Sequence, residues 1–296
     1  MVNTKDTSDL KESSSFLSRV DFEQNGYETA RPVTPLGILV QQLEQILNTA
    51  KTESVSTEFK TSLEQAYRLA AGLDPYLAEC ATAESPALAN LTERTQQEDW
   101  SKRFDDGETV KALEQEMLSG HIEGQLLKIL VSISQSKRVL EVGMFTGYSA
   151  LAIAEALPDD GYLLACEVDE YVSQFAVDCF AASEHGKKIE VRVAPAIETM
   201  RELVDAGESF DLAFVDADKG GYIDYLNLLL DTDLLAPNGF ICVDNTLMQG
   251  QPYLPAEQRT DNGEAIARFN SFVAKDPRVE QVLVPIRDGL TIIKRK

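Results

Sequence analysis

Histidine and cysteine, which bind zinc and build many nucleophilic sites, are scarce in this sequence. The 296 residues include two histidines, His121 and His185, and four cysteines with no Cys-x-x-Cys spacing. The cysteines therefore make neither a disulfide scaffold nor a zinc site, and little room remains for histidine-based metal or triad chemistry. Cys166 and Cys242 lie in apolar runs, where we expect buried thiols.

The sequence also has few positively charged residues and no long apolar run. It contains 27 Lys and Arg and 49 Asp and Glu, so the formal net charge is −22 at pH 7. This excess argues against nucleic-acid and anionic-membrane partners. No apolar run approaches the ~18 residues of a membrane span. Residues 1–10 lack a basic-then-apolar signal pattern, so we expect a cytoplasmic protein.

The first part of the chain is polar and then helical in pattern. Residues 1–30 predict a disordered polar tail. Residues 31–120 predict helices at 57–71, 86–97 and 108–119, with a further helix at 122–135. An earlier helix carries one apolar stripe, formed by Leu36, Leu39, Leu43, Ile46, Leu47 and Ala50. Because this stripe must be buried somewhere, we expect residues 31–120 to cap a binding-site entrance, to form a homodimer interface, or both.

From Lys137 onward, short apolar runs alternate with amphipathic segments. Strands are predicted at 138–142, 162–168, 189–193, 211–215, 240–243, 279–284 and 290–293. Helices fit between most of them, at 148–157, 170–182, 197–206, 221–230 and 263–274. This alternation predicts an α/β fold for residues 121–296, a Rossmann-like, doubly wound seven-stranded sheet, with the helical part as an N-terminal extension. Residues 285–289 are too few for a helical crossover, so the last strand should be antiparallel.

Ligands of such sheets bind beyond the carboxyl ends of the strands. The first strand is followed by Gly143 and Gly147, a G-x-x-x-G turn rather than the dinucleotide pattern G-x-G-x-x-G. Glu167 ends the second strand 24 residues after Gly143, where an acidic side chain typically binds a ribose diol. A solvated acid at a strand end is the alternative. Together the two features predict a cofactor that contains a nucleoside.

The fourth and fifth strands end in acidic residues. Asp216 and Asp218 follow the fourth strand, and Asp244 and Asn245 follow the fifth. Their oxygens suit Mg²⁺ or a similar divalent cation; helix capping and a side-chain-stabilised turn are the alternatives. Near a cation the pKa of Lys219 should fall, which suits a general base, although it could also be a surface lysine.

Six segments in one order carry a resemblance to a known family. They are Met117-Leu118-Ser119, Glu123-Gly124-Gln125, Leu140–Ser149, Phe214–Lys219, Asp244-Asn245-Thr246-Leu247, and Asp276-Pro277-Arg278 through Asp288-Gly289. Residues 117–296 thereby resemble the class I S-adenosylmethionine-dependent O-methyltransferases of the cation-dependent caffeoyl-CoA and catechol type. Residues 31–35, 70–77 and 98–104 resemble one subgroup, the O-methyltransferase of mycosporine-like amino acid biosynthesis, which converts demethyl-4-deoxygadusol to 4-deoxygadusol.

The resemblance implies S-adenosylmethionine as methyl donor and a small acceptor with vicinal oxygens. It implies a divalent cation held by Asp216, Asp244 and Asn245, with Asp216 and the proposed base Lys219 as catalytic residues. The positions that it implies for the cofactor are Met117, Ser119, Glu141, Gly143, Gly147, Ser149, Glu167, Ala196, Asp216 and Asp218.

Two features depart from the plant relatives. Met248 and Gln249 stand where those relatives have Trp-Asn, so we expect an acceptor pocket unlike their flat aromatic slot. The acidity of the chain also suits a polyanionic coenzyme A ester badly. An enzyme for catechols or caffeoyl-type phenols, a non-catalytic binding subunit and a nicotinamide dehydrogenase remain as alternatives.

Overall fold

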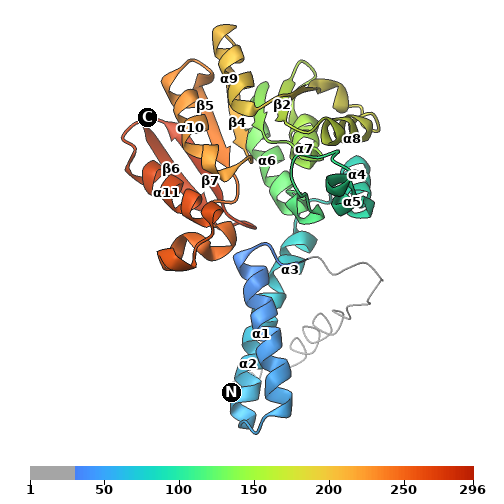
Figure 1. Ribbon diagram of the computed structural model, residues 1–296, viewed down its shortest axis with the longest axis vertical. Helices are drawn as coiled ribbons and strands as arrows, with labels where there is room; N and C mark the ends of the chain where they lie inside the picture. Colours follow the sequence, from blue (N-terminus) through green and yellow to red (C-terminus); the bar gives the residue numbers. More distant parts are fainter. Residues whose placement is uncertain (1–30) are drawn as a thin grey trace, which may run out of the picture. The chain divides into compact units, whose positions relative to one another are not determined.

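Within residues 31–296, which the computed structural model describes, seven strands form one mixed sheet (Figure 1). The strands are β1 (Arg138–Val142), β2 (Tyr162–Glu167), β3 (Ile189–Val193), β4 (Phe210–Val215), β5 (Leu235–Val243), β6 (Val279–Val284) and β7 (Leu290–Arg295). Their order is β3-β2-β1-β4-β5-β7-β6, with β7 antiparallel to both of its neighbours. The predicted sheet and its antiparallel last strand are confirmed. The tail predicted at 1–30 lies outside the described residues.

Helices precede the sheet and connect most of its strands. They are α1 (Pro35–Thr52), α2 (Thr57–Ala71), α3 (Leu73–Cys80), α4 (Pro86–Gln97), α5 (Trp100–Asp105), α6 (His121–Ser134), α7 (Tyr148–Ala156), α8 (Glu170–Phe180), α9 (Ala196–Asp205), α10 (Tyr222–Asp231) and α11 (Asp261–Lys275). Short 3₁₀ turns include η1 (Gln115–Met117), η3 (Lys219–Gly221) and η4 (Met248–Tyr253). Among the helices of this described part, none is both long and apolar enough to cross a membrane.

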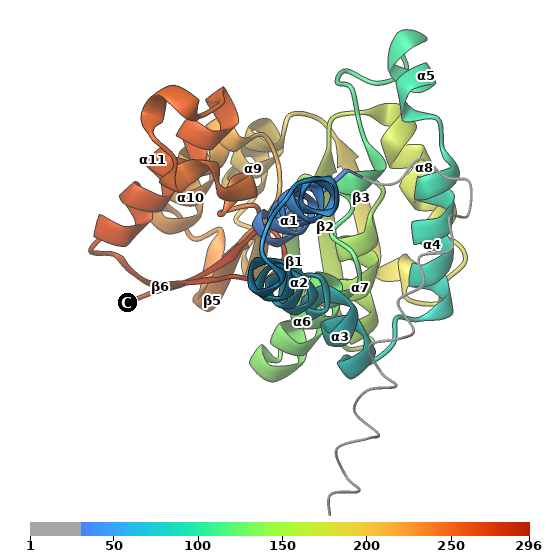
Figure 2. The ribbon, with the colours of Figure 1, turned by 90° about the horizontal axis from the view of Figure 1, so that it is seen from below.

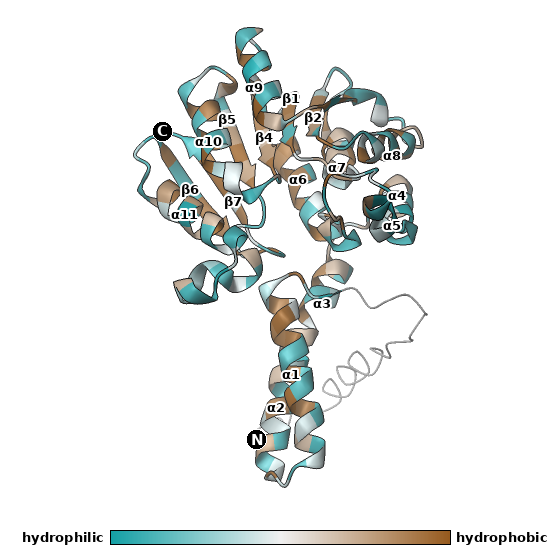
Figure 3. Cartoon of the chain, viewed as in Figure 1, coloured by the Kyte–Doolittle hydropathy of each residue, from teal (hydrophilic) through white to brown (hydrophobic). Residues whose placement is uncertain are grey.

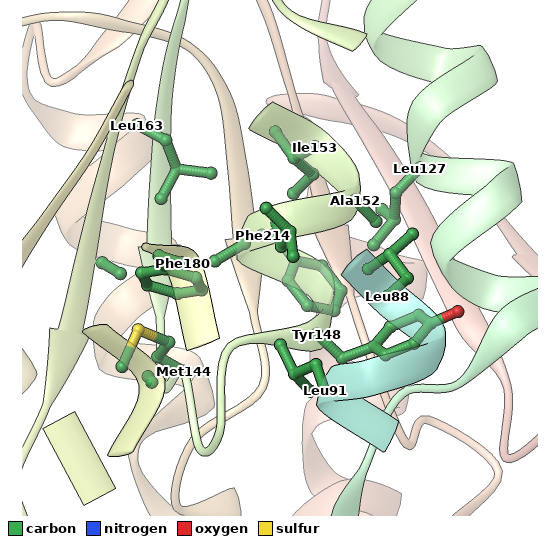
Figure 4. Packing of buried hydrophobic residues seen from close by; sticks show 14 of the residues in the cluster. Leu88, Leu91, Leu127, Met144, Tyr148, Ala152, Ile153, Leu163, Phe180 and Phe214 are labelled. Carbon is green, nitrogen blue, oxygen red and sulfur yellow. The ribbon is translucent and has the colours of Figure 1, made fainter. Parts of the chain in front are cut away.

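Alternate residues of each strand point to opposite faces of the sheet. Val139 of β1 joins the apolar cluster formed with α4, α6, α7 and α8. Leu140, the next residue, joins the cluster formed with α9, α10 and α11. Hydrophobic colour accordingly concentrates on the strands (Figure 3). On the first face Tyr148 packs with Leu91 and Leu127, which ties α4 and α6 to α7 (Figure 4).

The helix predicted at 108–119 is wrong. Gly107 and Gly120 bracket this segment with positive φ angles of 73° and 77°, and only η1 within it is helical. The backbone N–H of Val110 donates instead to the Asp169 carboxylate at 2.6 Å, beside the end of β2. A long-range polar contact therefore replaces the local hydrogen bonds that a helix would need.

The first two helices begin where the sequence provides a cap. Thr34 and Ser56 each accept a hydrogen bond from the backbone N–H three residues ahead. α1 and α2 pack side by side in both views (Figures 1 and 2), and α1 also contacts η4. Of the residues in these two helices only Ala50 is buried. Most of the apolar stripe predicted on α1 is therefore only partly buried by the rest of the same chain.

Candidate active site

The turn after β1 requires glycine at two positions. Gly143 has φ 89°, and a Cβ there would lie 2.2 Å from the backbone oxygen of Asp216. Gly147 has φ 86°, and a Cβ there would lie 2.3 Å from the ring of Phe180. The turn therefore brings the end of β1 against the end of β4. The predicted glycines and Asp216 lie at one edge of the sheet.

Glu167 is buried at the end of β2, so the solvated alternative is wrong. Its Oε2 accepts a hydrogen bond from the backbone N–H of Phe145 at 2.9 Å, within the glycine turn. Its Oε1 accepts from the N–H groups of Val168 and Asp169 at 2.7 and 3.0 Å. Burial raises the pKa of Glu167, although these hydrogen bonds oppose the rise. The carboxylate holds the turn in shape and keeps acceptor capacity on Oε2.

Glu141 points into the interior beneath the same turn. It is fully buried, and the hydroxyl of Ser149 donates to its Oε1. Within the described part of the chain its Oε2 has no hydrogen-bond partner. Burial raises the pKa of Glu141 to about 8. Because an unpaired buried carboxylate oxygen is costly, this pair fits a ligand that brings a cationic hydrogen-bond donor.

The remaining predicted cofactor positions lie on two other segments. Ser119 is buried and Met117 is 44% exposed, both just before α6, and Ala196 is buried at the start of α9. Arg287, in the turn between β6 and β7, donates to the backbone oxygen of Leu118 at 3.1 Å. None of the hydrogen bonds described for residues 31–296 joins these three positions to Glu141, so their role stays a prediction.

The ends of β4 and β5 converge on one lysine. Lys219 Nζ donates to Asp216 Oδ1 at 2.9 Å, to Asn245 Oδ1 at 2.6 Å and to the Tyr222 hydroxyl at 2.7 Å. Its side chain is only 12% exposed, so the surface-lysine alternative is wrong. Burial lowers the pKa of Lys219, but the charges around it, chiefly that of Asp216, outweigh burial and raise the pKa overall.

Asp244 is buried next to Lys219, whereas the hydrogen bonds of Asp218 go to other residues. Asp244 is 4% exposed, and its Oδ1 accepts from the backbone N–H of Asn245 at 2.6 Å. Burial, together with the charge of Asp216, raises the pKa of Asp244 to about 7. Asp218 instead accepts from the Gly221 N–H at 3.0 Å and from the Tyr225 hydroxyl at 2.5 Å. The capping alternative therefore describes what Asp218 does in the structure, and its cofactor role stays a prediction.

Three further charged residues border the site. Glu123 of α6 is 1% exposed, and its Oε2 lies 3.7 Å from Arg287 Nε. The other oxygen, Oε1, has no partner within residues 31–296; burial, then the charge of Asp244, raises the pKa of Glu123. Asp288 accepts from the Gln249 N–H at 2.6 Å, and burial raises its pKa to about 6. The sequence signal for Glu123 is its spacing, because it lies four and eight residues before Leu127 and Val131, on the buried face of α6.

The donor set fits a hard cation. Among the described residues no three His, Cys, Asp or Glu side chains are grouped to hold a metal, but one predicted donor is the amide of Asn245. Asp216, Asp244, Glu123 and Asp288 face two cationic side chains, Lys219 and Arg287. The cluster of carboxylate and amide oxygens and the unpaired Glu123 oxygen both suit a divalent cation bound by oxygen.

The sheet order with its antiparallel β7 is that of the S-adenosylmethionine-dependent methyltransferase class. Residues 105–296 match the O-methyltransferase family, and the chain belongs to this family. Caffeoyl-CoA O-methyltransferase 2 of Zea mays is 38% identical over 181 residues, which cover 58% of this chain and 68% of that protein. Caffeoyl-CoA O-methyltransferase of Petroselinum crispum is 35% identical over 181 residues, covering 58% and 74%.

Solved structures give the same class. The Podospora anserina methyltransferase PaMTH1, bound to SAH, aligns with TM-score 0.64 at 29% identity over 79% of this chain and 96% of that one. TomG of Streptomyces achromogenes, in complex with SAM, aligns with TM-score 0.60 at 27% identity over 76% and 96%. The protein is a SAM-dependent O-methyltransferase of the caffeoyl-CoA type, and the dehydrogenase and binding-subunit alternatives are set aside.

Proposed function

We propose that the chain is a cation-dependent enzyme that methylates one of two vicinal oxygens on a small ring enediol. The acceptor that we propose is demethyl-4-deoxygadusol, which would give 4-deoxygadusol in mycosporine-like amino acid biosynthesis. The convergence of Asp216, Asn245 and Lys219 Nζ carries the reaction class. The similarity of residues 31–35, 70–77 and 98–104 to that pathway's methyltransferase supports the acceptor.

Each residue of the site has a task in this reaction. Asp216, Asp244 and Asn245 would hold the cation, which as a Lewis acid supplies a lower pKa at the acceptor hydroxyl. Lys219 Nζ takes the hydroxyl proton. Glu141 and Ser149 would bind the methionine part of the donor, and Glu167 its ribose. Holding the acceptor oxygen in line with the sulfonium methyl then contributes much of the acceleration.

A catechol or caffeoyl-type phenol is the second candidate acceptor. The curated relatives named as caffeoyl-CoA O-methyltransferases favour it, and a catechol also offers vicinal oxygens. Met248 and Gln249 lie at the start of η4, a segment that α1 contacts directly. Their position supports an acceptor pocket different from that of the caffeoyl-CoA enzymes.

Methyl transfer from labelled S-adenosylmethionine tests the proposal. Demethyl-4-deoxygadusol and a catechol panel are offered in parallel, each with Mg²⁺ and with a chelator. Chelator-sensitive methylation of the cyclohexenone, well above the catechols, is the expected result. A preference for catechols would keep the reaction class and discard the pathway. Transfer that survives the chelator would contradict the cation site.

We also propose that the enzyme is a cytoplasmic homodimer. Leu39, Ile46, Phe59 and Leu69 of the α1–α2 pair are each between 47% and 82% exposed, which supports burial of this pair against a second copy. Sedimentation equilibrium measures the state directly. A wild-type monomer at micromolar concentration would contradict the dimer.

A further inference from the structure

The proposed base, Lys219, uses all of its hydrogen-bond donors within the site. An ammonium has three N–H groups, and Nζ has three acceptors, on Asp216, Asn245 and Tyr222. Two of these acceptors are oxygens that the proposed function assigns to the cation. The third, the Tyr222 hydroxyl, is outside the proposed ligand set.

The three acceptors therefore differ in what a bound cation does to them. Lone pairs of Asp216 Oδ1 and Asn245 Oδ1 that are shared with a cation are weaker acceptors for a lysine, and the two positive charges also repel each other. The Tyr222 hydroxyl keeps its acceptor lone pair. It is the protein partner through which Nζ stays at the site.

Tyr222 is fixed from two sides. Its hydroxyl donates to the backbone oxygen of Asp244 at 3.1 Å, so its hydrogen is committed and a lone pair is free for Nζ. Its ring is 1% exposed and packs edge-to-face on Phe269, with centroids 5.5 Å apart and an interplanar angle of 81°. The hydroxyl oxygen of Tyr222 is thus held at the end of β5, next to Lys219 and Asn245.

We propose that Tyr222 is a positioning residue for Lys219, holding Nζ at the edge of the Asp216–Asn245 pair during methyl transfer. With Nζ held there by the Tyr222 hydroxyl, the proton of the acceptor hydroxyl passes to Nζ while the oxygen–methyl bond forms and the sulfonium–methyl bond breaks, leaving a neutral thioether. This inference rests on the proposed function.

Kinetics of a double-mutant cycle test the proposal. Tyr222→Phe keeps the ring and removes the hydroxyl, and should lower kcat about tenfold with an unchanged KM for S-adenosylmethionine. Combined with Lys219→Met, it should add nothing to the loss caused by Lys219→Met alone. Tyr162→Phe is the matched control, because it removes a hydroxyl that donates to Glu190 at 2.7 Å at the far end of β2. Additive losses would overturn the proposal.

A second readout does not depend on turnover. Acetylation of Lys219 by an amine-reactive ester, followed by peptide mass spectrometry, reports how firmly Nζ is held. In saturating Mg²⁺ the rate at Lys219 should rise several-fold in Tyr222→Phe, while exposed Lys187 reacts as before. Equal rates at Lys219 in both proteins, with and without Mg²⁺, would overturn the proposal. If no acceptor is methylated, the proposed function fails, but this labelling result still decides the role of Tyr222.

Discussion

Replacing Glu141 with Gln should flatten the pH dependence of stability in the ligand-free protein. Burial raises the pKa of Glu141 from 4.5 to about 8, so between these values the folded state holds a proton that the unfolded chain has released. The stability that this proton contributes is complete below pH 4.5 and is lost as the pH rises toward 8. Each pH unit removes about 1.4 kcal/mol, and the interval from pH 5 to 7 removes about 2–3 kcal/mol.

Urea unfolding at pH 5, 6 and 7 measures this difference. The wild type should lose about 2–3 kcal/mol more than Glu141→Gln across the interval. Glu190→Gln is the control, because hydrogen bonds from Tyr162 and Arg192 lower the pKa of this exposed carboxyl. It is therefore ionised in both states and should keep the wild-type slope. If Glu141→Gln also keeps that slope, Glu141 is ionised in the folded protein and the burial argument fails.

Three further predictions concern the turn and the strand ends. Asp216→Ala should abolish turnover with every acceptor, and undiminished activity would contradict its catalytic and cation-binding assignment. Lys219→Ala should lower kcat about 10²-fold while calorimetry shows cofactor affinity largely kept; lost affinity would make it a binding residue. Gly107→Ala should cost about 1 kcal/mol of unfolding free energy for its left-handed φ. Gly143→Ala should cost about 3 kcal/mol or more, because its Cβ would also overlap the Asp216 oxygen; equal losses in urea unfolding would contradict the close approach.

The sequence predicted the helices and strands correctly where hydrogen bonds between neighbouring residues determine the local structure. The helix predicted at 57–71 has those bounds because Ser56 caps it and its apolar spacing is regular. The helix predicted at 108–119 does not form because the backbone N–H of Val110 donates to the carboxylate of Asp169, 59 residues away in the sequence. α3 was not predicted: Gly72 ends α2, and its φ of −81° and ψ of −13° let a new helix begin at Leu73 directly after it.

The site shows the same division. Asp216, Lys219 and Asn245 could be predicted to meet, because parallel strands end at one edge of a sheet. Tyr222 and Arg287 could not be assigned in this way. Tyr222 acts through a helix turn that follows Lys219, and Arg287 reaches Leu118 across 169 residues of sequence. The Arg287 contact depends on where the chain returns, which spacing along the sequence does not encode, whereas Tyr222 lies only three residues after Lys219.

The charges at the site link the two parts of the proposed mechanism. Burial is the largest influence on the pKa of Lys219 and lowers it, but Asp216 and Asp244 reverse the outcome. With those carboxylates neutralised by a divalent cation, the effect of burial would dominate and would lower the pKa of Lys219. Lys219 can therefore serve as a base only where the carboxylates beside it are balanced by another positive charge. The base assignment therefore depends on the cation site, and evidence against the cation site would remove both.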